Sequence, residues 1–164
     1  MRKLLVVLFS VVILLAACSP AATTQADVVD FDHARQTLID YFSLLHAGDY
    51  EAAVARQAYD EDYYTWLRQN NTDVDPQDRA ALMRAACTYQ LVCREVKQVL
   101  RGEQGSENQY EFWVEFANED GTLFVLGPCC GEDETSAPSV SEFQFFVEKV
   151  DSEFFVHGGP VYRP

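Results

Sequence analysis

The stretch Leu-Leu-His-Ala-Gly-Asp-Tyr-Glu-Ala-Ala, residues 44–53, divides the first half of the chain into helices. Ahead of it, apolar residues recur every three or four positions over residues 31–45, which is the spacing of an amphipathic helix. Gly48 is suited to the left-handed turn that ends a helix, and Asp49 is suited to the N-cap of the next one. The sequence therefore predicts two helices joined by a tight turn, the second over residues 50–57.

Two further helices are expected before the pattern changes. Residues 61–69 are rich in aromatic side chains, and the pair Asn70-Asn71 ends this run. In Asp-Pro-Gln-Asp, residues 75–78, an aspartate suited to the N-cap precedes a proline, which is tolerated at the first helical position. This order predicts a helix that continues to about Tyr89.

After Val92 the apolar period changes from 3.6 residues to 2. Residues 110–116 alternate between apolar and polar side chains, with Trp113 among the outward positions, which is typical of a half-buried strand. The turn-forming residues 118–121 are expected to bring residues 122–126 back as the hairpin partner of that strand.

A second hairpin is expected from residues 142–150 and 154–156, which flank a short polar turn. Residues 92–101 are suited to the first strand of the same sheet. Helices gathered at the start of the chain and strands at its end indicate an α+β domain.

The helix, Gly-Asp break and alanine-rich second helix around residues 44–53 resemble the opening of the NTF2-like superfamily, which includes SnoaL and ketosteroid isomerase relatives. The resemblance spans residues 30–164. It implies that the N-terminal helices pack on a curved antiparallel sheet, which wraps around them as a cone and often leaves an apolar pocket at its mouth. A cystatin-like α+β arrangement is the alternative.

The first residues carry the pattern of an export signal. Arg2 and Lys3 precede an apolar run over residues 4–17, shorter than the roughly 20 residues that span a bilayer. The run ends in Leu15-Ala16-Ala17-Cys18, which resembles the lipobox of bacterial lipoproteins. That resemblance implies cleavage before Cys18 and attachment of fatty acyl chains such as palmitate to this cysteine.

Three parts of the chain follow from these patterns: a signal peptide over residues 1–17, a lipidated cysteine and flexible tether over residues 18–29, and a single domain over residues 30–164. Two or more acyl chains anchor a protein stably. The expected location is the outer face of the cytoplasmic membrane, or the outer membrane, of a bacterium.

The charge of the chain excludes one class of partner. Its 26 acidic and 12 basic residues give a formal charge of −14, and loss of the leader leaves 10 basic against 26 acidic residues, or −16. Nucleic-acid binding needs a surface rich in Lys and Arg. An acidic domain of this kind is therefore not expected to bind nucleic acid.

Four cysteines remain in the exported domain, at positions 87, 93, 129 and 130, and they suggest two disulfides. Pairing Cys87 with Cys93 would force a strained bond between the neighbours Cys129 and Cys130. The two preferred arrangements therefore link Cys87 and Cys93 to Cys129 and Cys130. The spacing differs from the paired ligands of zinc sites, and no metal or cofactor is predicted.

The resemblance to ketosteroid isomerase directs attention to residues that could serve as a general base or as a donor to an oxyanion. Asp40, Tyr63 and His157 are the candidates of the right chemical type. Asp40 falls off the apolar stripe of its helix, however, and no convergent catalytic set is evident in the sequence.

An aromatic group in an acidic setting, formed by Tyr59, Tyr63, Tyr64 and Trp66, is the candidate binding site. Ring faces there could hold a small apolar or cationic ligand. The sequence thus favours a non-catalytic module of the cell envelope that binds a small ligand or another protein. The alternatives are a SnoaL-like isomerase or hydrolase using an acid and a tyrosine, and a structural or assembly role at the surface.

Overall fold

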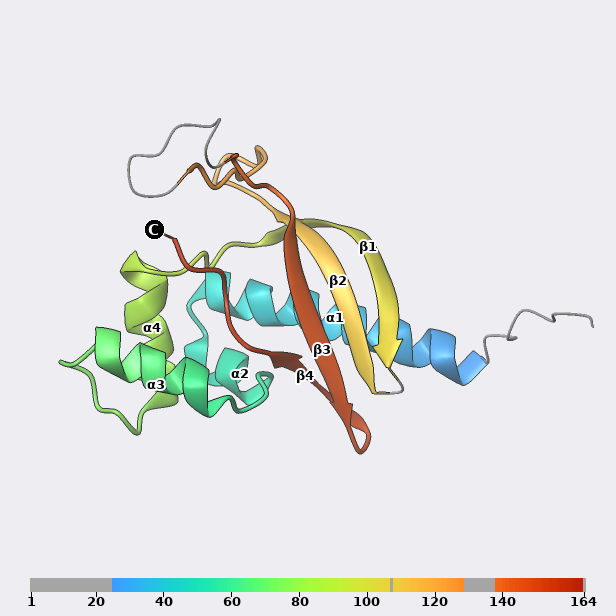
Figure 1. Ribbon diagram of the computed structural model, residues 1–164, viewed down its shortest axis with the longest axis horizontal. Coiled ribbons are helices and arrows are strands. Elements are labelled where there is room, and N and C mark those ends of the chain that lie inside the picture. Colours follow the sequence, from blue (N-terminus) through green and yellow to red (C-terminus); the bar gives the residue numbers. More distant parts are fainter. Residues whose placement is uncertain (1–24, 107, 129–137, 164) are drawn as a thin grey trace, which may run out of the picture.

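The computed structural model describes residues 25–106, 108–128 and 138–163, with side chains from residue 28 onward. Four helices precede four strands along the chain (Figure 1). The helices are α1 (Gln25–Ala47), α2 (Tyr50–Ala55), α3 (Glu61–Asn70) and α4 (Arg79–Tyr89), and the strands are β1 (Val96–Ser106), β2 (Gln109–Phe116), β3 (Phe143–Val150) and β4 (Glu153–His157). The α+β prediction is confirmed.

The turn between α1 and α2 forms as the sequence predicts. Gly48 adopts a φ of +80°, a conformation that L side chains rarely tolerate, and its N–H donates to Leu45 O at 3.1 Å. Asp49 then caps α2, because its carboxylate accepts a hydrogen bond from Ala52 N at 3.2 Å. This turn reverses the chain and sets α2 against α1.

The predicted start of the fourth helix is wrong by three residues. The carboxylate of Asp75 accepts from Gln77 N at 2.9 Å and its carbonyl accepts from Asp78 N at 3.1 Å, so these residues form a turn. Asp78 is the N-cap instead, since its carboxylate accepts from Ala81 N at 2.9 Å. Pro76 therefore lies in the turn and not in the first helical position.

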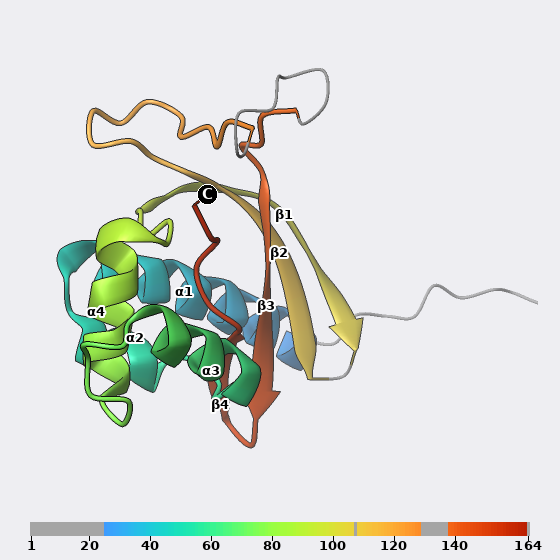
Figure 2. The ribbon, with the colours of Figure 1, turned by 60° about the vertical axis from the view of Figure 1, so that its left-hand side comes forward.

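The four strands form an antiparallel sheet in the order β1-β2-β3-β4. Helix α1 lies across one face of this sheet, and α2, α3 and α4 gather beside the C-terminal half of α1 (Figures 1 and 2). The pairing of β1 with β2 is interrupted by register shifts at Val96/Gln98, Val99/Arg101 and Gln104/Ser106. These irregularities lie along an edge strand of the sheet.

The expected hairpin between residues 110–116 and 122–126 forms only in part: the turn over residues 118–121 is confirmed and Phe124 N donates to Phe116 O at 2.9 Å, but residues 122–126 form no strand. Strand β2 pairs instead with β1 on one side and, from Gln109 to Val114, with β3 on the other. The segment that follows β2 makes only isolated bridges, Ala117 with Leu123 and Leu126 with Val140. The β3–β4 hairpin is confirmed, and β1 begins and ends later than residues 92–101.

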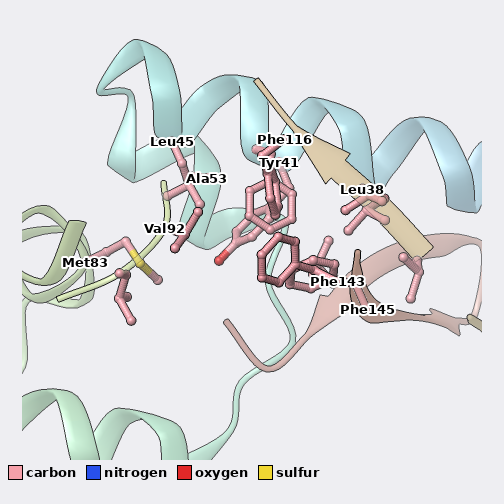
Figure 3. Packing of buried hydrophobic residues seen from close by; sticks show 14 of the residues in the cluster. Leu38, Tyr41, Leu45, Ala53, Met83, Val92, Phe116, Phe143 and Phe145 are labelled. Atoms are coloured by element: carbon pink, nitrogen blue, oxygen red, sulfur yellow. The ribbon is translucent and has the colours of Figure 1, made fainter. Parts of the chain in front are cut away.

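Aromatic side chains fill the space between α1 and the sheet (Figure 3). The ring of Phe42 on α1 lies 4.8 Å from that of Phe116 and 4.8 Å from that of Phe145, both on the sheet. Gly102 on β1 makes room for this packing, because a Cβ there would lie 2.5 Å from the Phe112 ring. Each large apolar side chain buried in this way stabilises the fold by roughly 1.5–3 kcal/mol.

The cysteine pairing differs from the preferred arrangements. Cys87 and Cys93 form a disulfide with each other, with Cα atoms 5.4 Å apart. The physical reason is the reversal that ends α4, where Gln90 N and Leu91 N both donate to Ala86 O and turn the chain back toward Cys87. Cys129 and Cys130 lie outside the described residues.

Helix α1 begins earlier than the sequence suggests. It starts at Gln25, so residues 25–29 are helical, although they were expected to belong to the tether. No Gly or Pro occurs there, so the helix can extend beyond its buried stripe. The leader and Cys18 lie outside the described residues. Within the described ranges, no helix combines the length and apolar character needed to cross a membrane.

Candidate functional site

The three catalytic candidates lie in different settings. Asp40 on α1 has a side chain 39% exposed, accepts from Gln36 Nε2 at 2.8 Å and forms an ion pair with Arg56 at 3.6 Å. Tyr63 on α3 is partly buried and directs its hydroxyl at Met83 Sδ, 3.8 Å away. His157 is exposed at the end of β4. No hydrogen bond or ion pair joins these three side chains in the described part of the chain.

The interior of the described fold holds few buried polar residues. Gln57 and Asn71 are the buried polar or charged residues of the described ranges, so no carboxylate or histidine there is buried. The same ranges contain no group of three His, Cys, Asp or Glu side chains that could hold a metal ion. The volume enclosed by α1 and the sheet is occupied by aromatic side chains.

The structure brings the predicted aromatic residues together as one cluster. Tyr59 and Tyr64 stack with ring centroids 5.5 Å apart and planes 9° apart, and Tyr63 meets Tyr64 edge-on at 5.6 Å. Trp66 stacks on Tyr63 at 6.4 Å. Tyr64 is fully buried, whereas Tyr59 is 56% exposed.

Hydrogen bonds tie this cluster to the end of the sheet. The Tyr64 hydroxyl donates to Gln57 Oε1 at 2.6 Å, and Gln57 Nε2 donates to the carbonyl of Gly158. The backbone beside Gln57 also follows β4, since Ala58 N donates to Val156 O at 2.9 Å. The segment between α2 and α3 is therefore held against the outer edge of β4.

Sequence reasoning missed the residue at the centre of this region, Arg79, the first residue of α4. Its guanidinium carbon lies 4.6 Å from the centre of the Tyr64 ring and 5.4 Å from that of Tyr59, and its Nη2 donates to Val54 O at 3.2 Å. The faces expected to attract a cationic ligand thus already carry a cation of the protein. No local sequence signal links position 79 to these tyrosines.

Burial raises the pKa of Tyr41 and of Tyr64. Desolvation raises the pKa of Tyr64, and the neighbouring Arg79 opposes that rise. Desolvation also raises the pKa of Tyr41, with further contributions from Tyr63 and Tyr64 and an opposing one from Arg79. These hydroxyls stay protonated, so they do not act as bases; Tyr64 donates to Gln57, whereas the buried Tyr41 hydroxyl has no hydrogen-bond partner among the described residues.

The acidic residues beside the cluster have structural partners. Asp60 caps α3 by accepting from Tyr63 N at 3.0 Å. Glu61 accepts from the Tyr59 hydroxyl and forms an ion pair with Arg68 at 2.8 Å. These two contacts, the Tyr59 hydrogen bond first, lower the pKa of Glu61 to about 2.

A groove opens on the outer side of the cluster, away from the filled interior. This outer groove encloses about 340 Å³ and is lined mainly by Val54, Ala55, Tyr59, Arg79, Val150 and Phe155. A second hollow of about 270 Å³ shares Ala55 and Phe155 with it. Tyr59 and Arg79 therefore stand at a mostly apolar surface, to which the β3–β4 hairpin contributes two side chains that the sequence did not indicate.

Comparison with solved structures gives only weak likeness. No protein-family model and no curated protein matches the chain. Among solved structures, it is similar to a Campylobacter jejuni protein described as "Putative NTF2-like transpeptidase", with a TM-score of 0.42 and 11% sequence identity, over 76% of this chain and 97% of that one.

Proposed function

We propose that this protein is a lipid-anchored extracytoplasmic binding module, without catalytic activity of its own, which holds a small apolar ligand in the outer groove. The observation that supports the proposal is where the fold leaves room for a ligand. The groove lies outside, between α2 and the β3–β4 hairpin, and its lining is mostly apolar. Its volume of about 340 Å³ falls at the lower end of the roughly 300–1,000 Å³ of ligand pockets.

The fold that we propose is the NTF2-like cone. The Gly48-Asp49 turn, the helix α1 lying on a curved antiparallel sheet and the terminal β3–β4 hairpin support it. In this cone, Phe42, Phe116 and Phe145 pack ring against ring where a substrate would otherwise enter. Such packing favours binding on the outside over reaction on the inside.

The alternative of a SnoaL-like isomerase or hydrolase has less support. It requires an acid or base close to a tyrosine hydroxyl inside an open cone. Asp40 instead pairs with Arg56 at the surface, and Tyr63 contacts Met83. Binding of another envelope protein, or a purely structural role, would follow if the groove accepts no small ligand.

The membrane location is proposed from the leader. The lipobox-like Leu15-Ala16-Ala17-Cys18 supports acylation of Cys18 and anchoring at the outer face of the cytoplasmic membrane or in the outer membrane. The strongly acidic chain, with a formal charge of −14, supports the absence of a nucleic-acid partner.

Binding of the uncharged apolar dye Nile red to the chain from residue 19 onward tests the binding function. This shortened chain keeps the whole described core, whose residues run from Ala34 to Val156. We expect dye fluorescence to rise on binding and to fall in the Ala55→Phe variant, which fills the groove. The matched control, Ala47→Phe, changes an exposed alanine at the end of α1. Equal binding by both variants, or no binding, would contradict the proposal.

A further inference from the structure

The guanidinium of Arg79 retains hydrogen-bonding capacity that the described structure does not use. Arginine carries five N–H donors, and Arg79 Nη2 spends one of them on Val54 O at 3.2 Å. Its Nε is buried and has no hydrogen-bond partner. Arg79 also lines the outer groove, and an acceptor bound there could use the remaining Nη–H groups.

Arg79 also has no ion-pair partner among the described residues. Five ion pairs join other basic and acidic side chains of the described residues, and none of them includes Arg79. No acidic residue lines the outer groove, although the chain contains 26 of them. Arg79 therefore stands at a mostly apolar surface with no carboxylate partner among the described residues.

The position of the guanidinium is fixed before any ligand arrives. It rests on the faces of Tyr64 and Tyr59 and is tied to the end of α2 through Val54 O. The guanidinium N–H groups other than the buried Nε–H and the one bound to Val54 O can donate to a carboxylate, and such charge-assisted contacts are among the stronger hydrogen bonds of proteins. A group held in place in advance loses less entropy on binding.

We infer that the outer groove takes an amphiphilic monocarboxylate, whose carboxylate binds Arg79 and whose apolar chain lies along Ala55 and Phe155. The second hollow continues from these two residues and is also lined by Arg56, Glu153 and Phe154, which leaves space beside Phe154 and Phe155 for a longer chain. Val150 and Val54 supply apolar contacts on either side. This inference rests on the proposed binding function and adds the charge and the chemical class of the ligand.

Three probes of equal chain length separate the contributions of charge and apolar contact: octanoate, 1-octanol and octyltrimethylammonium. Calorimetric titration into the chain from residue 19 onward is expected to show octanoate binding about tenfold or more tightly than 1-octanol, because the charge-assisted contact is added to the same apolar one. Octyltrimethylammonium is expected to bind least.

Variants assign this preference to Arg79. Arg79→Gln should remove the preference for octanoate and leave 1-octanol binding in place, whereas Arg84→Gln, on the exposed side of the same helix, should retain the preference. Arg79→Gln also loses the contact with Val54 O. A second pair of variants, at Val150, leaves that contact in place. Val150 is 47% exposed, and Val150→Glu should weaken octanoate selectively while Val150→Gln should not.

The outcomes separate the two proposals. Octanoate binding no tighter than 1-octanol, or a preference that survives in Arg79→Gln, would overturn the assignment of a carboxylate ligand while leaving the binding function intact. Failure of all three probes to bind would overturn both.

Discussion

The hydroxyl of Tyr64 donates to Gln57 Oε1 at 2.6 Å inside the fold, and this contact joins α3 to the segment between α2 and α3 that lies against β4. Both side chains are buried, Tyr64 completely and Gln57 to all but 3%. The contact is therefore shielded from water, and loss of either partner leaves a buried polar group unsatisfied.

We predict that Tyr64→Phe lowers the free energy of unfolding by about 1–3 kcal/mol, because Gln57 Oε1 loses its donor in a place that water does not reach. Urea denaturation followed by fluorescence measures the change. The double variant Tyr64→Phe/Gln57→Leu should recover part of the loss. Additive effects of the two substitutions would show that the hydrogen bond contributes nothing.

Gly102→Ala is predicted to destabilise the protein by about 1–3 kcal/mol, because the new Cβ would lie 2.5 Å from the Phe112 ring and 2.8 Å from that of Phe31. Thermal unfolding measures the effect. Gly127→Ala is the matched control, since a Cβ at that position meets nothing within 4 Å. A Gly102→Ala variant as stable as Gly127→Ala would refute the close packing of β1 on α1.

Peptide mapping without reduction should recover Cys87 and Cys93 in one disulfide-linked fragment. In the chain-entropy account, closing so short a loop stabilises the fold by about 2 kcal/mol, and Cys93→Ala should remove this contribution. A fragment that links Cys87 or Cys93 to Cys129 or Cys130 would contradict the observed pairing.

Glu61 should contribute stability that depends on pH. Its contacts with Tyr59 and Arg68 lower its pKa from 4.5 to about 2 in the folded state, so the ionised carboxylate is favoured by folding. The contribution is complete above pH 4.5 and is lost as the pH falls toward 2. Glu61→Gln should thus be less stable than the wild type at neutral pH, and the difference should vanish near pH 2.

The measurement for this prediction is unfolding by urea across the acidic range. Asp62→Asn, one residue further along α3, is the control for a general effect of removing a negative charge. The prediction fails if Glu61→Gln and Asp62→Asn show the same dependence on pH.

Cys18→Ala is predicted to leave an unprocessed precursor or to release the protein from the membrane fraction. The reason is that both cleavage and acylation in lipoproteins require the cysteine that Cys18 resembles. Metabolic labelling with a palmitate analogue, together with membrane fractionation, measures both events. Normal processing and unchanged membrane retention of the variant would contradict the lipid anchor.

Local patterns in the sequence were sufficient to predict much of this fold. Turn chemistry at Gly48 and Asp49 predicted the α1–α2 turn, because both residues act on their own backbone. Alternation predicted β2 and the β3–β4 hairpin. The hairpin expected at residues 122–126 forms only at its turn, because β1 and β3 pair with most of β2 and leave the returning segment only the end of that strand.

The candidate site was predictable only in part. Tyr59, Tyr63, Tyr64 and Trp66 do form one cluster, since they lie within a single short segment. Arg79 and Phe155 come from distant parts of the chain, and their places beside Tyr59 depend on how α4 and β4 pack. Spacing along the sequence carries no information on such contacts.

The irregular pairing of β1 has a consequence for molecules crowded side by side. An edge strand with a regular row of free backbone N–H and C=O groups can pair with a strand of another molecule. Breaks in register and charged side chains oppose such pairing. Strand β1 carries three register shifts and includes Lys97, Arg101 and Glu103. If the proposed lipid anchor holds copies together in two dimensions at a high local concentration, this edge would resist their fusion into continuous sheets.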